Sequence, residues 1–126
     1  IFTINHIYSD IIEDAHHTSA KYPDEIPEFT KTDLEEEFLG NFAAPFVKGA
    51  KIRLGCRYLN EYEIKENDTL LLVSSIEHVF VADLDIQQDD GWLKLENANT
   101  VAINGLDGYA TTKLLDRFAY ARPKKA

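Results

Sequence analysis

The sequence predicts a mainly β fold with one or two short helices, whose strands are antiparallel. Between residues 51 and 64, apolar side chains alternate with polar ones, as in a strand with one buried face. A polar turn follows at residues 65–68, and a second long strand is expected over residues 69–81. Two strands joined by a short polar turn form an antiparallel hairpin. Strands of this length are typical of a barrel rather than a flat sheet.

The two strands of this predicted hairpin carry further signals. The alternation that starts at Ile52 slips near Asn60, and such a slip predicts a β-bulge or a sharp bend. The second strand is apolar on both faces at residues 70–73. Cys56 occupies an apolar position of the alternating set, so we expect its thiol to be buried.

Two helices are expected before the hairpin. Residues 1–7 have the alternation of a strand, and Ser9 is a candidate N-cap for a helix that ends near Ser19. Pro23 prevents the continuation of that helix because it lacks an N–H group. A second short helix is expected from Thr32 or Asp33 through Leu39, closed by Gly40. A strand and two turns are expected after the hairpin, at residues 101–103, Asn104-Gly105 and Asp107-Gly108.

Composition limits the classes of protein that fit. A chain of 126 residues with 44% hydrophobic residues suits one globular domain. The formal net charge of -9 and the scattered basic residues argue against a nucleic-acid partner. Cys56 is the single cysteine, and no apolar run approaches the length of a membrane span. We therefore expect a soluble, cytoplasmic protein without an internal disulfide.

Self-sufficient catalytic and metal-binding motifs are absent from the sequence. The adjacent His16 and His17 would point about 100° apart on a helix, and no His-Glu-x-x-His pattern occurs. Ser19 has no Gly-x-Ser-x-Gly context, and no glycine-rich phosphate loop is present. We therefore predict neither a metal site nor a catalytic side chain.

Residues 15–23 are the best candidate for a ligand-binding segment. Thr18 and Ser19 offer hydroxyl groups, Lys21 offers a cation, and Tyr22 offers a flat ring with a polar end. A loop with these groups at a helix end can hold a polar ligand. The alternative left open is a segment that caps the helix and satisfies its own side chains.

The order and spacing of motifs over almost the whole chain resemble the flavin reductase-like FMN-binding split-barrel family, the group of flavoredoxin and the reductase components of two-component monooxygenases. One of these motifs is His-Thr-Ser-Ala-Lys-Tyr-Pro at residues 17–23. The other motifs lie at residues 2–5, 28–29, 52–56, 67–69, 90–91, 104–109, 117–118 and 121–123.

This resemblance implies a six-stranded Greek-key split barrel that forms a homodimer and binds FMN at the subunit interface. Hydride would pass from NAD(P)H to the flavin, so the cofactor would carry the chemistry. The resemblance also implies a monooxygenase component as a partner, since the reductases of this family serve one. The residues expected near the flavin are Thr18, Ser19, Ala20, Lys21, Tyr22, Asn104 and Tyr109.

The resemblance covers the later part of the family's domain. We therefore expect residues 1–126 to form a single domain that lacks its N-terminal strands, which in this family supply most contacts to the flavin. The alternative function is a noncatalytic split-barrel module that keeps the fold for dimerisation or for partner binding.

Overall fold

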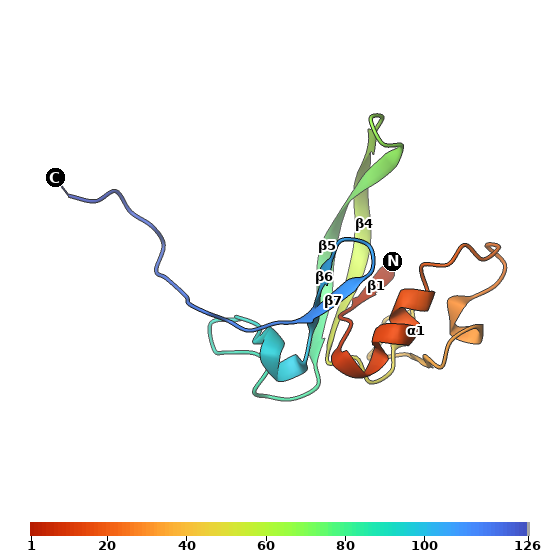
Figure 1. Cartoon of the computed structure of the whole chain (residues 1–126), viewed down its shortest axis with the longest axis horizontal. Coiled ribbons are helices and arrows are strands. Elements are labelled where there is room, and N and C mark those ends of the chain that lie inside the picture. The colour runs from red at the N-terminus through yellow and green to blue at the C-terminus, as the bar shows by residue number, and fades with distance from the viewer. Residues whose placement is uncertain (126) are drawn as a thin grey trace.

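The computed structural model describes residues 1–125 of the chain (Figure 1). It is mainly β, with one short α-helix, α1 (Ile12–His17). The strands are β1 (Phe2–Asn5), β2 (Glu36–Glu37), β3 (Phe46–Val47), β4 (Ile52–Ile64), β5 (Thr69–Val81), β6 (Val101–Asn104) and β7 (Gly108–Thr111). Three short 3₁₀ helices accompany them, η1 (Ser9–Ile11), η2 (Glu28–Thr30) and η3 (Leu95–Ala98). None of the helices in residues 1–125 combines the length and apolar character needed to cross a bilayer.

The long hairpin of β4 and β5 confirms the main prediction from the sequence. Its strands pair antiparallel from Ile52 opposite Val81 to Ile64 opposite Thr69. The slip near Asn60 is a bulge, because Tyr58 and Asn60 oppose consecutive residues of β5 and leave Leu59 without a partner. A second irregularity leaves Glu77 unpaired on β5, so the two extra residues compensate and the pairing continues to the turn.

Strand β1 pairs with a strand that lies some fifty residues farther along the chain. It pairs antiparallel with β4, with Phe2 opposite Cys56 and Asn5 opposite Arg53, so the sheet order is β1-β4-β5. The strand predicted over residues 1–7 is thus confirmed in type, with shorter bounds. The remaining strands form two separate two-stranded sheets, β2-β3 and β6-β7, and all pairs in the described residues are antiparallel.

The core surrounds the base of the long hairpin. Ile52 of β4 is fully buried and packs with Ile86 and Ala98 from the segment that follows β5. A cluster of aromatic rings, Phe42, Phe46, His78 and Phe80, packs beside β5. The Cys56 thiol is buried, as predicted. The outer half of the hairpin lies outside this core.

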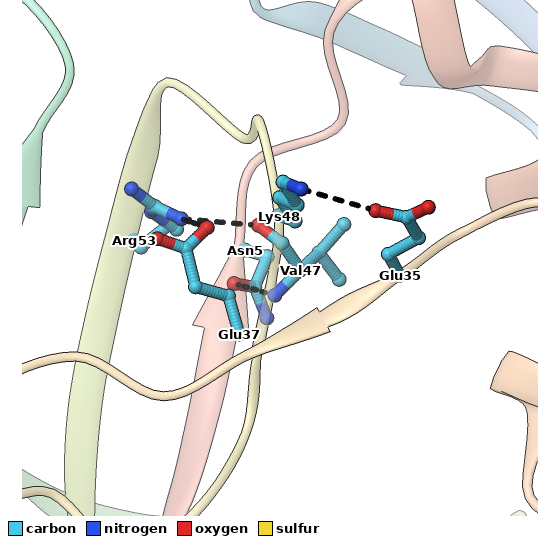
Figure 2. Close-up of polar contacts among 6 residues, drawn as sticks. All are labelled: Asn5, Glu35, Glu37, Val47, Lys48 and Arg53. Atoms are coloured by element: carbon cyan, nitrogen blue, oxygen red, sulfur yellow. Dashed lines mark hydrogen bonds and ion pairs between the residues drawn. The ribbon is translucent and has the colours of Figure 1, made fainter.

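The helix predicted from Thr32 or Asp33 to Leu39 is wrong. Glu36 and Glu37 instead form β2, which pairs with β3. A polar network fixes this pairing to the sheet (Figure 2): Arg53 Nη1 lies 3.4 Å from Glu37 Oε2 and donates to the carbonyl of Val47, and the Val47 amide donates to Asn5 Oδ1. The partly buried guanidinium of Arg53 pairs with Glu37, and tertiary contacts of this kind override a local helix signal.

The first helix starts and ends differently from the prediction. Its first turn, Ser9–Ile11, is 3₁₀, and no side chain caps either η1 or α1 at the N-terminus. Ser9 is therefore not an N-cap. The α-helix ends at His17, two residues before the predicted end, and Thr18 is its C-cap.

Candidate functional site

The end of α1 is closed by two hydroxyl groups. The Thr18 hydroxyl donates to the carbonyl of Ala15 over 2.6 Å, and the Ser19 hydroxyl donates to the carbonyl of His16 over 2.8 Å. The same two carbonyls also accept hydrogen bonds from the backbone amides of Thr18 and Ser19, so each hydroxyl adds a second bond to the last turn of the helix. The capping function that the sequence left open is thus present in the structure. Each hydroxyl oxygen keeps lone pairs that can accept a further hydrogen bond.

His16 connects this helix end to the hairpin of β6 and β7. Its Nδ1 lies 2.8 Å from the hydroxyl oxygen of Tyr109, and the two rings meet edge to face at 5.6 Å. Tyr109 stands opposite Ile103 in the β6-β7 pair. The contact brings the two segments named by the sequence, residues 15–23 and 104–109, to one place.

His17 makes a parallel contact on the other side of the helix end. Its Nε2 forms a short hydrogen bond with the hydroxyl of Tyr22, and their rings also meet edge to face. Two imidazole–phenol pairs therefore flank the C-terminus of α1. Sequence reasoning considered His16 and His17 as metal ligands and did not predict a tyrosine as the partner of either one.

The turn between β6 and β7 sets the position of Tyr109. Gly105 has a φ of 69°, a backbone conformation that glycine adopts without strain. Gly108 stands opposite Asn104, and a Cβ at Gly108 would lie 2.8 Å from the Asn104 carbonyl oxygen. Only glycine fits there, so the turn depends on both residues. The turn predicted at Asn104-Gly105 is thus present, with Gly105 in the left-handed region.

A shallow depression of about 440 Å³ lies beside the helix end. Its lining contains carboxylates, imidazoles and an ammonium group, from Glu13, Asp14, His16, His17 and Lys31. Asp14 accepts a hydrogen bond from the backbone amide of Asp33, which holds one carboxylate in place. Within residues 1–125, no three His, Cys, Asp or Glu side chains are grouped closely enough to hold a metal ion.

The other predicted residues differ in exposure. Thr18, Tyr22 and Tyr109 are half-buried, while Ser19, Ala20, Lys21 and Asn104 are exposed. A separate apolar cavity of about 350 Å³ lies farther along the chain, and sequence reasoning did not predict it. It is lined by Trp92, Leu93, Leu95, Glu96, Ala102 and residues 111–114.

Comparison with solved structures finds a neighbour of high similarity. A protein described as a putative flavin reductase with split barrel domain, from Shewanella frigidimarina NCIMB 400, superposes with a TM-score of 0.87 and 39% sequence identity, over 94% of this chain and 60% of that chain. The resemblance to split-barrel flavin reductases is confirmed. Comparison with protein-family models and with curated proteins finds no match.

Two solved structures of lower sequence identity show the same fold. Flavoredoxin of Desulfovibrio vulgaris (Miyazaki F) has a TM-score of 0.74 at 17% identity, over 94% of this chain and 62% of that chain. Nitrilotriacetate monooxygenase component B from Bacillus cereus has a TM-score of 0.75 at 17% identity, over 92% of this chain and 58% of that chain. The chain thus spans about three fifths of the length of these three neighbours.

The donor groups at the helix end fit part of a flavin mononucleotide. Tyr22 and Tyr109 present flat rings with polar ends, which suit contact with a flavin ring. Lys21 is exposed and has no carboxylate within 4.0 Å among residues 1–125, so its ammonium can approach a phosphate. The carboxylates of Glu13 and Asp14 do not suit a phosphate, because like charges repel. The residues therefore fit one side of the cofactor.

Proposed function

We propose that this chain is part of an FMN-binding flavoprotein that acts as an NAD(P)H-dependent flavin reductase or in flavin-mediated electron transfer. The observation that carries the proposal is the His16–Tyr109 contact, in a chain 39% identical to a split-barrel flavin reductase. This contact joins the two segments that offer hydroxyl, phenol and ammonium groups to one ligand.

Each residue has a role in binding rather than in proton transfer. Lys21 pairs with the FMN phosphate, and the hydroxyl oxygens of Thr18 and Ser19 accept hydrogen bonds while they cap the helix. Tyr22 and Tyr109 contact the ring system, Asn104 contributes its amide, and Ala20 allows a close approach. The bound flavin supplies the hydride acceptor for NAD(P)H. No side chain of the described chain acts as a catalytic acid or base in this proposal.

The same proposal includes the fold, the oligomeric state and the partner of the protein. The described strands belong to a split Greek-key barrel in a single domain, and a homodimer completes the flavin site at its subunit interface. A monooxygenase component is the proposed recipient of reduced flavin, supported by the similarity to nitrilotriacetate monooxygenase component B.

A second candidate function is a noncatalytic split-barrel module for dimerisation or partner binding. Two observations favour it: Thr18 and Ser19 already satisfy the helix end, and the outer half of the β4-β5 hairpin exposes many apolar side chains. Such a module would keep the fold and bind no flavin.

A titration with two flavins tests the proposed function. FMN carries a phosphate and riboflavin does not, so Lys21→Gln should weaken FMN binding about three- to tenfold and leave riboflavin binding unchanged. Lys65→Gln, in the turn of the long hairpin, is the matched control and should change neither affinity. Flavin fluorescence, measured during titration of the whole protein, gives the dissociation constants for FMN and for riboflavin. If the protein binds neither flavin, the noncatalytic module is the better account.

A further inference from the structure

Residues 112–125 form an extended arm that is fixed at its root (Figure 1). The Thr112 hydroxyl donates to the carbonyl of Thr100, and the Leu114 amide donates to Glu96 Oε2. Arg117 donates to Gln88 Oε1 over 2.9 Å and to Asp90 Oδ2 over 3.1 Å, and its guanidinium lies 3.9 Å from the centre of the Trp92 ring. These contacts determine the direction in which the arm leaves the segment between β5 and β6.

Beyond Arg117 the arm carries large side chains that the described chain leaves bare. Phe118 is 86% exposed and Tyr120 is 82% exposed. Arg122 and Lys124 follow at alternate positions, and alternate side chains of an extended chain point to the same side. The guanidinium of Arg122 lies 5.0 Å from the Tyr120 ring, consistent with a shared side. Along its length the arm therefore presents two aromatic rings and then two cations.

The outer half of the long hairpin offers a surface of matching character. Leu70, Leu72, Ser74 and Ile76 alternate along an unbroken stretch of β5, so they share one face. Their partners on β4, in the same order, are Glu63, Glu61, Tyr58 and Cys56. Leu70, Leu72, Ile76 and Tyr58 are each about half exposed. This surface, called the hairpin face below, combines apolar side chains with two carboxylates near the turn.

The charges of the arm and the hairpin face are complementary and unpaired in the described chain. Among residues 1–125, no ion pair within 4.0 Å involves Glu61, Glu63, Arg122 or Lys124. Two-stranded hairpins are at best marginally stable alone in water, so an apolar hairpin that projects from the body needs a cover.

The position of the arm indicates that a second copy of the chain covers the hairpin face. Figure 1 shows the arm leaving the body in a different direction from the tip of the hairpin. The root of the arm is held by Glu96 and Asp90, which lie in the segment after β5 and not in the outer half of the hairpin. In a two-fold dimer each arm would reach the other copy, so the contact would form twice.

We propose that the C-terminal arm of one copy lies across the hairpin face of a second copy. Phe118 and Tyr120 pack on Tyr58, Leu72 and Ile76, and the cations of Arg122 and Lys124 lie beside Glu61 and Glu63. The inference rests on the homodimer in the proposed function, and it adds the segment and the surface that hold the two copies together.

Disulfide trapping between co-expressed copies of the whole protein tests this contact. One copy carries Phe118→Cys and the other, with a tag of different size, carries Leu72→Cys. Since each chain has only one new thiol, a disulfide between them joins two copies. Docking raises the local thiol concentration, so we expect trapping about a hundredfold faster than for unassociated chains. The native Cys56 thiol is buried and stays unreactive.

Leu71 provides a matched control on the opposite face of the same strand. Leu71 and Leu72 are both 53% exposed, but adjacent residues of a strand point to opposite faces. Leu71→Cys should therefore trap Phe118→Cys far more slowly. Arg122→Glu with Lys124→Glu in the arm should reduce trapping, and Glu61→Lys with Glu63→Lys in the other copy should restore it.

Light scattering separates failure of this inference from failure of the proposed function. A dimer in which Leu71→Cys and Leu72→Cys trap the arm equally, or not at all, overturns the arm contact and leaves the dimer in place. A monomer overturns both the dimer and the arm contact. Flavin absorbance of the same samples reports on FMN binding independently, because none of the substituted residues is in the proposed flavin site.

Discussion

The Nδ1 of His16 lies 2.8 Å from the hydroxyl oxygen of Tyr109, and this contact joins two segments that are 93 residues apart in the chain. His16 is in the last turn of α1, and Tyr109 is in β7. The bond forms only when the β6-β7 hairpin is placed against the helix end. It is therefore a direct indicator that the proposed flavin site is assembled.

Removal of the Tyr109 hydroxyl should loosen this assembly. Tyr109→Phe is expected to destabilise the protein by about 0.5–1 kcal/mol, the lower part of the range for one hydrogen bond, because the contact is exposed. A double-mutant cycle with His16→Ala, followed by urea unfolding, measures the coupling. Tyr120→Phe, at a tyrosine that is 82% exposed, should change stability little. Strictly additive effects of the Tyr109 and His16 changes would contradict the contact.

Gly108→Ala should disturb the turn that positions Tyr109. The new Cβ would lie 2.8 Å from the Asn104 carbonyl oxygen, a backbone atom that cannot easily move. We expect a loss of about 1–3 kcal/mol in the free energy of unfolding, as for other overpacked sites. Ala110→Gly in the same strand is the control and should cost only about 0.5–1 kcal/mol. An unchanged stability in Gly108→Ala would show that the turn has another geometry.

Ser19→Ala distinguishes ligand binding from simple helix capping. If the Ser19 oxygen accepts a hydrogen bond from FMN, the change should weaken FMN binding by about 0.5–1.5 kcal/mol. Thr30→Ala is a matched control, because the Thr30 hydroxyl also donates to the carbonyl three residues before it and lies outside the site. Equilibrium titration with FMN measures the FMN affinity of both variants. A loss of stability in Ser19→Ala without a change in FMN affinity would favour capping alone.

The carboxyl of Asp90 should titrate below its ordinary pKa of 3.8. The backbone amide of Trp92 and then the guanidinium of Arg117 donate to it and lower its pKa. A lowered pKa in the folded state means that this contribution to stability is present above pH 3.8 and is lost as the pH falls through the folded-state pKa. NMR titration of Asp90 should show an upward shift of its pKa in Arg117→Ala. Arg122→Ala should leave this pKa unchanged, and an equal shift in both variants would contradict the Arg117–Asp90 contact.

The sequence predicted the long hairpin well because its signal is local and repeated. Alternation over β4 and β5 identifies both strands, and the slip at Asn60 identifies the bulge at Leu59. The pair β2-β3 was missed, since two-residue strands have no periodicity. Glu36 and Glu37 are stabilised there by pairing with β3 and by the distant Arg53, which a local helix signal does not include.

The candidate site was predictable in part. The residue types of Thr18 to Tyr22 indicated a polar loop at a helix end, and the glycines at 105 and 108 indicated the turn before Tyr109. The partner of each histidine was not predictable, because His16–Tyr109 is a tertiary contact between distant segments. Resemblance to a family supplied the idea that both segments serve one ligand.

The absorption spectrum of the purified whole protein tests the central claim most directly. The account predicts the yellow absorption bands of bound FMN, after purification or after addition of FMN and gel filtration, and bleaching of these bands when NADPH or NADH is added without oxygen. A folded protein that stays colourless and takes up no added FMN would contradict it.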